Sequence, residues 1–265
     1  KTSQNRAAAE GLGGGSVART ASGTGSLLTR TMDTGASSFD ALFEEANDLA
    51  SQRSFRLAAA KYREAIQLEP RRPVAHFNLG CALERTGETE TAAMSFHAAM
   101  QRYPEDSSPW AESAAASFNC LTQDSAPTPR ATPSWFMSDE ALKRLSSRVV
   151  AATSDDPLTK RGRLQAITMR AAVLASDATG FKPPWPTGPR TAAELREAAA
   201  LFQEAAAGAG GDGDLQKDLE VRAAACSAAS SVLLPQSVEN RADVSKPKAD
   251  KMKLRSRQDG EQARW

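Results

Sequence analysis

Two neighbouring stretches of this chain repeat one residue pattern at a spacing of 34 residues, and this spacing limits what the chain can fold into. The first stretch covers 39–70 and the second covers 73–104, and each ends in a proline. Such a period is typical of stacked helix pairs, because each pair can bury its apolar face only against its neighbours. The matched residues are Leu42 and His76, Ala46 and Gly80, Leu49 and Leu83, Ala58 and Ala92, Tyr62 and Phe96, Ala65 and Ala99, and Pro70 and Pro104.

Small residues mark the points where the two helices of each pair are expected to cross. At these points only a small side chain leaves room for the facing helix. A glycine inside a helix costs about 1 kcal/mol relative to alanine. Its use at Gly80 therefore predicts a packing need that exceeds this cost. The residues predicted to pack the repeats are Ala46, Ala58, Gly80, Ala92 and Phe96, with Pro70 and Pro104 stopping the second helices.

Looser copies of the pattern follow over 105–234. A third pair starts near Trp110 and is opened by an insertion at about 122–137, which is rich in proline. A fourth pair carries a second insertion at 177–190, after which Thr191 and Glu194 form a capping box that starts a helix. A last helix, about 214–234, is expected to cap the array. We therefore predict an all-α solenoid of about four helical hairpins plus a capping helix, regular over 39–104 and degenerate over 105–234.

Both ends of the chain are predicted to be flexible when alone. Residues 1–37 are rich in Ser, Thr, Gly and Ala, a composition that buries too little apolar area to fold. They carry few acids, which also resembles an organellar transit peptide. The tail, 235–265, is basic, and its last 25 residues hold eight Lys or Arg against four acids. A solvated tail is the simplest interpretation, with contact to an anionic partner, membrane headgroups or RNA as the alternative.

The net charge and the cysteine content indicate the kind of environment and partner to expect for the protein. The net charge is +1, so no strong field draws the chain as a whole toward nucleic acid. Cys81, Cys120 and Cys226 lie far apart without a metal or redox spacing, which favours a reducing intracellular compartment, cytoplasmic or organellar (plastid or mitochondrion). No run approaches the ~18 apolar residues of a transmembrane helix, so none is predicted.

The sequence offers little support for catalysis. His76 and His97 are the only histidines, and neither has a Cys or carboxylate at the spacing of metal ligands. The glycine cluster at 11–16 lacks the Lys and Ser or Thr of a phosphate loop. We therefore predict no catalytic residue, no metal site and no cofactor. An enzyme with an unrecognised site is kept as a third hypothesis.

With two units in register, the chain resembles the tetratricopeptide-repeat family. The clear resemblance covers about a quarter of the chain and extends loosely over 39–234. It implies antiparallel helix pairs stacked in a right-handed superhelix, with the first helix of each pair lining a concave groove that binds peptides. The groove and partner-binding residues that the resemblance implies are Phe43, Asn47, Phe77, Asn78, Cys81, Glu84, Arg85 and Phe118.

One subfamily of these proteins clamps the C-terminal carboxylate of chaperones with two Lys, two Asn and one Arg. The corresponding residues here are Phe43, Asn47, Asn78, Ser108 and Glu112. Both asparagines are present, but all three cations are missing, so a carboxylate clamp is not expected. The groove is instead predicted to be apolar and mildly acidic, which suits an extended or helical segment with aliphatic and basic residues.

These observations favour a non-catalytic scaffold or adaptor that binds one or more protein partners. Such a protein is a natural subunit or assembly factor of a larger complex, and its flexible ends and proline-rich insertions are expected to help wrap a partner. The alternative is an organellar RNA-associated factor that uses the basic tail. Nucleic acid is the less favoured partner, because the predicted solenoid carries no basic stripe.

Overall fold

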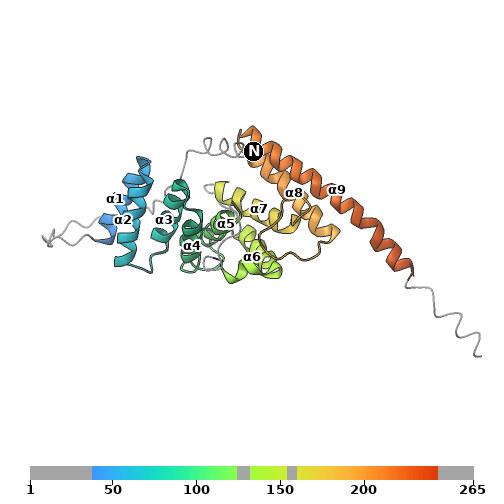
Figure 1. The fold of residues 1–265 in the computed structure, drawn as a ribbon, viewed down its shortest axis with the longest axis horizontal. Coiled ribbons are helices and arrows are strands. Elements are labelled where there is room, and N and C mark those ends of the chain that lie inside the picture. The colour runs from blue at the N-terminus through green and yellow to red at the C-terminus, as the bar shows by residue number, and fades with distance from the viewer. Residues whose placement is uncertain (1–37, 124–131, 154–159, 244–265) are drawn as a thin grey trace, which may run out of the picture.

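The chain folds into an elongated row of helices that pack in the order in which they follow one another (Figure 1). The computed structural model describes residues 38–123, 132–153 and 160–243, with residues 160 and 234–243 described by their backbone alone. Within these ranges every regular element is a helix, so the predicted all-α, solenoid-like fold is confirmed. The elements are α1 (Phe39–Ser51), α2 (Phe55–Leu68), α3 (Pro73–Thr86), α4 (Thr89–Met100), α5 (Ser108–Gln123), the 3-10 helix η1 (Ser134–Met137), α6 (Asp139–Ala152), α7 (Lys160–Ala175), α8 (Ala192–Gly208) and α9 (Gly213–Asp243).

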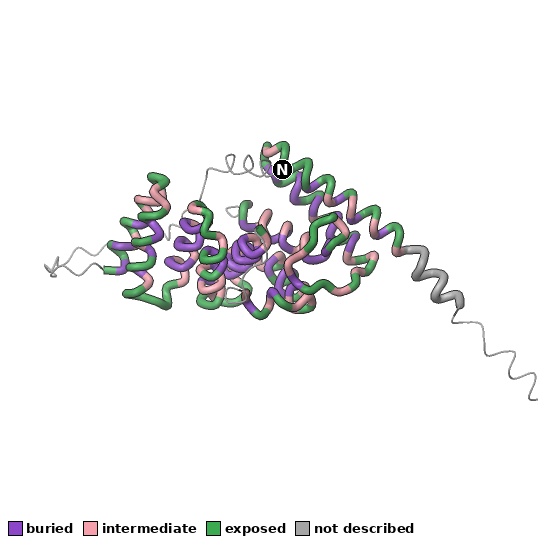
Figure 2. Tube along the Cα trace, in the orientation of Figure 1, coloured by how far each residue is buried: buried purple, intermediate pink, exposed green. Residues whose placement is uncertain are grey.

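The first two helix pairs, α1 with α2 and α3 with α4, pack through very small residues. Ala46, Ala58 and Ala92 are completely buried, and Figure 2 shows the buried positions gathered where helices face one another. A Cβ placed on Gly80 of α3 would lie only 2.8 Å from ring carbons of Phe96 on α4. This contact gives a physical reason for a glycine in the middle of a helix, because no larger residue admits the ring.

The loop after α2 is tied to the next pair by one backbone carbonyl. The carbonyl oxygen of Pro70 accepts a hydrogen bond from His76 Nε2 at 2.9 Å and another from Arg102 Nε at 2.9 Å. Both Pro70 and Pro104 lie just beyond the ends of the second helices, α2 and α4. Burial lowers the pKa of His76, which favours the neutral ring that makes this contact.

The third unit departs from a simple hairpin. Helix α5 packs against α4 and then more extensively against α7 than against α6. Gly162 of α7 permits this approach, because a Cβ there would lie 2.7 Å from the Glu112 carboxylate of α5. The predicted insertion at about 122–137 contributes η1, whose Phe136 is completely buried, while 124–131 lie outside the described residues.

The last helix is longer than predicted. Helix α9 runs to Asp243, so the expected end near residue 234 is too early. Pro235 lies inside the helix, where a proline removes one backbone hydrogen bond and bends the helix without having to end it. Of the predicted flexible tail 235–265, residues 235–243 belong to α9, while 244–265 and the predicted flexible segment 1–37 lie outside the described residues.

Enlarging Gly80 tests the close contact between α3 and α4. We expect Gly80→Ala to lower the free energy of unfolding by about 1–2 kcal/mol, because overlap with the buried Phe96 ring outweighs the gain in helix propensity. Urea unfolding followed by circular dichroism measures the change. Gly213→Ala, at a site with no atom within 4 Å of the new Cβ, is the matched control. A Gly80→Ala protein as stable as the wild type contradicts the account of this contact.

Candidate functional site

The first helices of the successive units lie side by side and share one face. Asn78 Nδ2 of α3 donates a hydrogen bond to Asn47 Oδ1 of α1 at 3.1 Å. Cys81 of α3 lies close enough to Glu112 of α5 for the two to interact electrostatically. Glu112 in turn rests against Gly162 of α7. We call the surface that α1, α3, α5 and α7 form along these contacts the first-helix face.

Two aromatic side chains occupy equivalent positions on neighbouring helices of this face. Phe43 of α1 and Phe77 of α3 are separated by the 34-residue period, and both are half-buried. The ring of Phe43 stacks on Phe39 at a centroid distance of 5.5 Å, and the ring of Phe77 meets Phe96 edge-on at 5.3 Å. The two rings are therefore held in place while part of each remains accessible.

The two predicted asparagines make a network within the protein. Asn47 Oδ1 accepts one hydrogen bond from the Tyr62 hydroxyl at 2.7 Å and another from Asn78. Asn78 is buried, so of this pair only the half-buried Asn47 offers surface to a partner. Burial raises the pKa of Tyr62 to about 12, which keeps its hydroxyl protonated as a donor. The prediction that Asn78 lines an open groove is therefore wrong as to its exposure.

Charges of both signs surround Cys81. The carboxylates of Glu84 and Glu112 and the guanidinium groups of Arg85 and Arg161 all act on the Cys81 thiol. Two acids and two bases act on this thiol, so this part of the face is of mixed charge, while a mildly acidic groove as a whole stays a prediction. Arg161 was missed because it belongs to α7, and the approach of α7 to α5, which Gly162 permits, is not indicated by the 34-residue spacing.

The prediction that Phe118 lines the groove is corrected by the structure. The structure buries this predicted groove residue of α5 beneath the two insertions. Its ring lies 6.0 Å from the ring of Phe136 and 5.3 Å from that of Trp185, in centroid distances. A chain position that faces outward in a regular repeat is thus covered here by aromatic residues of the insertions. The aromatic residues within 122–137 and 177–190 were the available signal that these loops pack inward.

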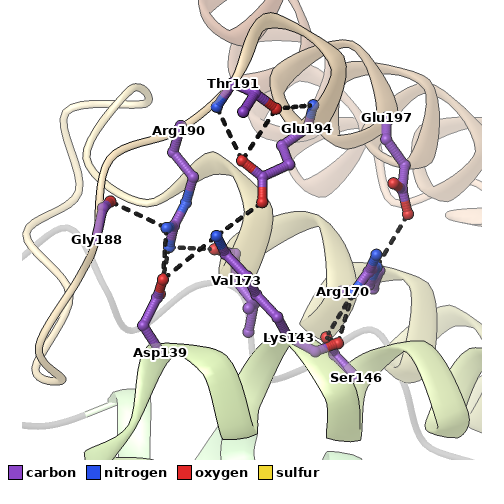
Figure 3. A network of polar contacts seen from close by, with 10 residues as sticks. All are labelled: Asp139, Lys143, Ser146, Arg170, Val173, Gly188, Arg190, Thr191, Glu194 and Glu197. Atoms are coloured by element: carbon purple, nitrogen blue, oxygen red, sulfur yellow. Dashed lines mark hydrogen bonds and ion pairs between the residues drawn. The ribbon is translucent and has the colours of Figure 1, made fainter.

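The 177–190 loop is fixed to its own chain by a buried ion pair (Figure 3). Two nitrogens of the Arg190 guanidinium bind both oxygens of Asp139, at the start of α6, at 2.8 and 2.6 Å. The Arg190 and Asp139 side chains are only 5% and 13% exposed. Arg190 also donates to the carbonyl oxygens of Gly188 and Val173, at 3.0 and 2.9 Å. The loop predicted to wrap a partner is therefore held against α6 and α7.

Further charges continue this network toward α8. Lys143 Nζ lies 2.7 Å from Glu194 and 3.4 Å from Asp139. Glu194 also completes the predicted capping box with Thr191, which the structure confirms. Arg170 of α7 binds Glu197 at 2.9 Å. Three bases and three acids thus join α6, α7, α8 and the loop, an arrangement that suits structural support.

The two histidines are also engaged in packing. Trp135 Nε1 donates to His97 Nδ1 at 3.4 Å, and His76 holds the Pro70 carbonyl. In the described part of the chain no group of three His, Cys, Asp or Glu side chains is arranged to hold a metal ion. Among the described helices none is both long and apolar enough to span a membrane. No protein-family model and no curated protein matches the chain.

Removing the Arg190 guanidinium tests the support given to the loop. We expect Arg190→Met to lower the free energy of unfolding by about 3 kcal/mol, because the buried Asp139 carboxylate loses both guanidinium hydrogen bonds and keeps only Lys143 and the Gly188 backbone among its described partners. Arg63→Met, which removes an exposed ion pair at 4.0 Å, is the control and is expected to cost less than about 1 kcal/mol. Equal losses in the two variants, measured by urea unfolding, contradict a structural role for the buried pair.

Acid should weaken the same network. Burial alone raises the pKa of Asp139, but hydrogen bonds and charge from Arg190 outweigh it, and the net pKa is lowered. The pKa of Glu194 is lowered in the same way, because the interactions with Lys143 and Thr191 outweigh the effect of burial. A carboxylate whose pKa is lowered in the folded state stabilises the fold at pH values above its pKa in the unfolded state, which is about 4. This contribution is lost as the pH falls.

We therefore expect the free energy of unfolding to drop as the pH falls from about 5 to about 3, with a smaller drop in Asp139→Asn. Urea unfolding at a series of pH values measures the slope. Asp48→Asn, which changes an exposed carboxylate of α1, is the control. A slope that is the same in Asp139→Asn and the wild type contradicts the assignment.

Proposed function

We propose that the protein is a non-catalytic scaffold or adaptor of the tetratricopeptide-repeat type, which binds an extended or helical segment of a protein partner on its first-helix face. The 34-residue period, the small residues at the helix crossings and the adjacent first helices support this proposal. Binding by such a face is consistent with a role as a subunit or assembly factor of a larger complex.

The observation that carries the proposal is the pair of half-buried aromatic rings at equivalent positions of α1 and α3. Neighbouring packed helices lie about 8–10 Å apart. In an extended polyproline-II segment, residues i and i+3 are about 9 Å apart, so two apolar side chains of a partner can reach Phe43 and Phe77 together. Packing behind each ring limits its motion, which reduces the entropy lost on binding.

Mixed charge beside the rings suggests what the rest of the segment looks like. Glu84 is half-buried and Arg85 is exposed, and both lie about two turns along α3 from Phe77. A partner segment that carries both an acid and a base after its apolar residues matches this order of charges. A segment with a carboxylate alone is not favoured, since the acids Glu84 and Glu112 stand among the bases.

The titratable groups on the face are better suited to binding than to chemistry. Burial raises the pKa of the Cys81 thiol to about 12, so its reactive thiolate form is scarce near neutral pH. His76 lies away from solvent with its Nε2 bound to a carbonyl oxygen. These features support a non-catalytic role.

A displayed library of random peptides, selected on the full-length protein, tests the proposal. Selected peptides should share two apolar residues, and their affinities are then measured by fluorescence anisotropy. We expect Phe77→Leu and Glu84→Lys to weaken binding at least about tenfold, which corresponds to about 1.4 kcal/mol. Both changes remove contacts on the face and preserve most of the packing.

Two changes on second helices serve as controls. Glu64→Lys makes the same change of charge as Glu84→Lys on α2, and Leu57→Ala shortens an exposed apolar side chain of α2. Both are expected to leave binding unchanged. If the selection enriches no peptide, or if the α2 variants weaken binding as much as the α3 variants, the first-helix face is not the binding site.

A further inference from the structure

Helix α9 carries an uncovered apolar stripe on the side turned away from α8. Val221 and Val232 are each 68% exposed, and Ala228 is exposed between them. Val221, Ala225, Ala228 and Val232 follow one another at intervals of four, three and four residues, which places them on one side of a helix. We call these four residues the α9 stripe.

The side of α9 opposite the stripe faces the body of the protein. Leu219, Ala223, Cys226 and Ser230 are buried, and the apolar three of them share a core with α7 and α8. Val221 lies two residues from both Leu219 and Ala223, which is about 200° around the helix. The α9 stripe therefore cannot be covered by α8.

The length of α9 also exceeds what α8 can support. Helix α8 has 17 residues and α9 has 31, so they measure about 25 and 46 Å. Figure 1 shows the end of α9 extending well past α8. Helices in proteins gain most of their stability from packing, and the end of α9 that extends past α8 lacks packing against α8.

Residues 244–265 of the chain are poorly suited to cover the stripe. They contain ten charged residues but only four large apolar ones, Val244, Met252, Leu254 and Trp265, and no apolar face at helical spacing. The other helices of the row have neighbours before and after them, apart from α1 at the opposite end. The spacing of the stripe, four, three and four residues, is the same in both directions along α9, as an antiparallel pair related by a two-fold axis requires.

We propose that a second copy of this chain covers the α9 stripe, and that two α9 helices pack antiparallel across their stripes to form a dimer. A two-fold axis near Ala225 and Ala228 sets Val221 of one copy opposite Val232 of its partner. The alanines at the centre let the helices approach closely, and each α8 lies on the side of its α9 turned away from the partner helix. The stripe is about 17 Å long, which is short for a permanent interface, so the dimer is reversible.

Sedimentation of the full-length protein, from about 1 to about 200 µM, tests the proposal. The average mass is expected to rise with concentration toward that of a dimer. Val221→Glu or Val232→Glu should raise the dissociation constant at least about tenfold, because each change appears twice in the dimer. Leu57→Glu, at a residue of α2 that is 60% exposed, is the matched control and should leave the dimer intact.

A double variant tests the antiparallel arrangement. Combining Val221→Glu with Val232→Lys sets opposite charges against each other only in an antiparallel pair, so this protein should recover most of the dimer. Circular dichroism confirms that each variant remains folded. A monomer at every concentration, a dimer unaffected by Val221→Glu, or a double variant no better than the single ones overturns the proposal. The outcome is independent of peptide binding at the first-helix face.

Discussion

The close approach of paired helices is the constraint on which the regular part of this fold depends. Where α3 meets α4, ring carbons of Phe96 lie so near Gly80 that even a methyl group would overlap them. Ala46 and Ala58 allow the same approach in the first pair. Because short loops join these helices, each pair fixes the position of the next. The alignment of the first helices, and so the face that they form, follows from this packing.

The second half of the chain is held together by different means. Here aromatic side chains of the two insertions fill the core over α5, with Trp185 packed on Phe118 and Phe136. The buried pair of Arg190 and Asp139 fixes the loop that carries Trp185. A buried ion pair adds little stability over an apolar contact but is costly to break, so it enforces one position of the loop. The insertions therefore stabilise the packing of the helices instead of lying free for a partner. The first-helix face remains the candidate binding surface.

The sequence predicted most of the fold but less of the site. Period and helix signals placed the first two pairs and the capping box at Thr191, since local spacing decides these features. The exposure of Phe118 and Asn78 was predicted wrongly, because it depends on which distant segments cover them. Arg161 and Gly162 were missed for the same reason: the approach of α7 to α5 has no local signal. Aromatic residues in loops were the one overlooked clue.

Hydrogen–deuterium exchange of the full-length protein, with and without a saturating selected peptide, tests the central claim most directly. Local opening of a helix slows when a ligand covers it. The account predicts slower exchange in α1 and α3 on binding, with a smaller effect in α5 and α7 and none in α2 and α4. Protection confined to α2 and α4, or to α9, would place the binding surface elsewhere and contradict the role assigned to the first helices.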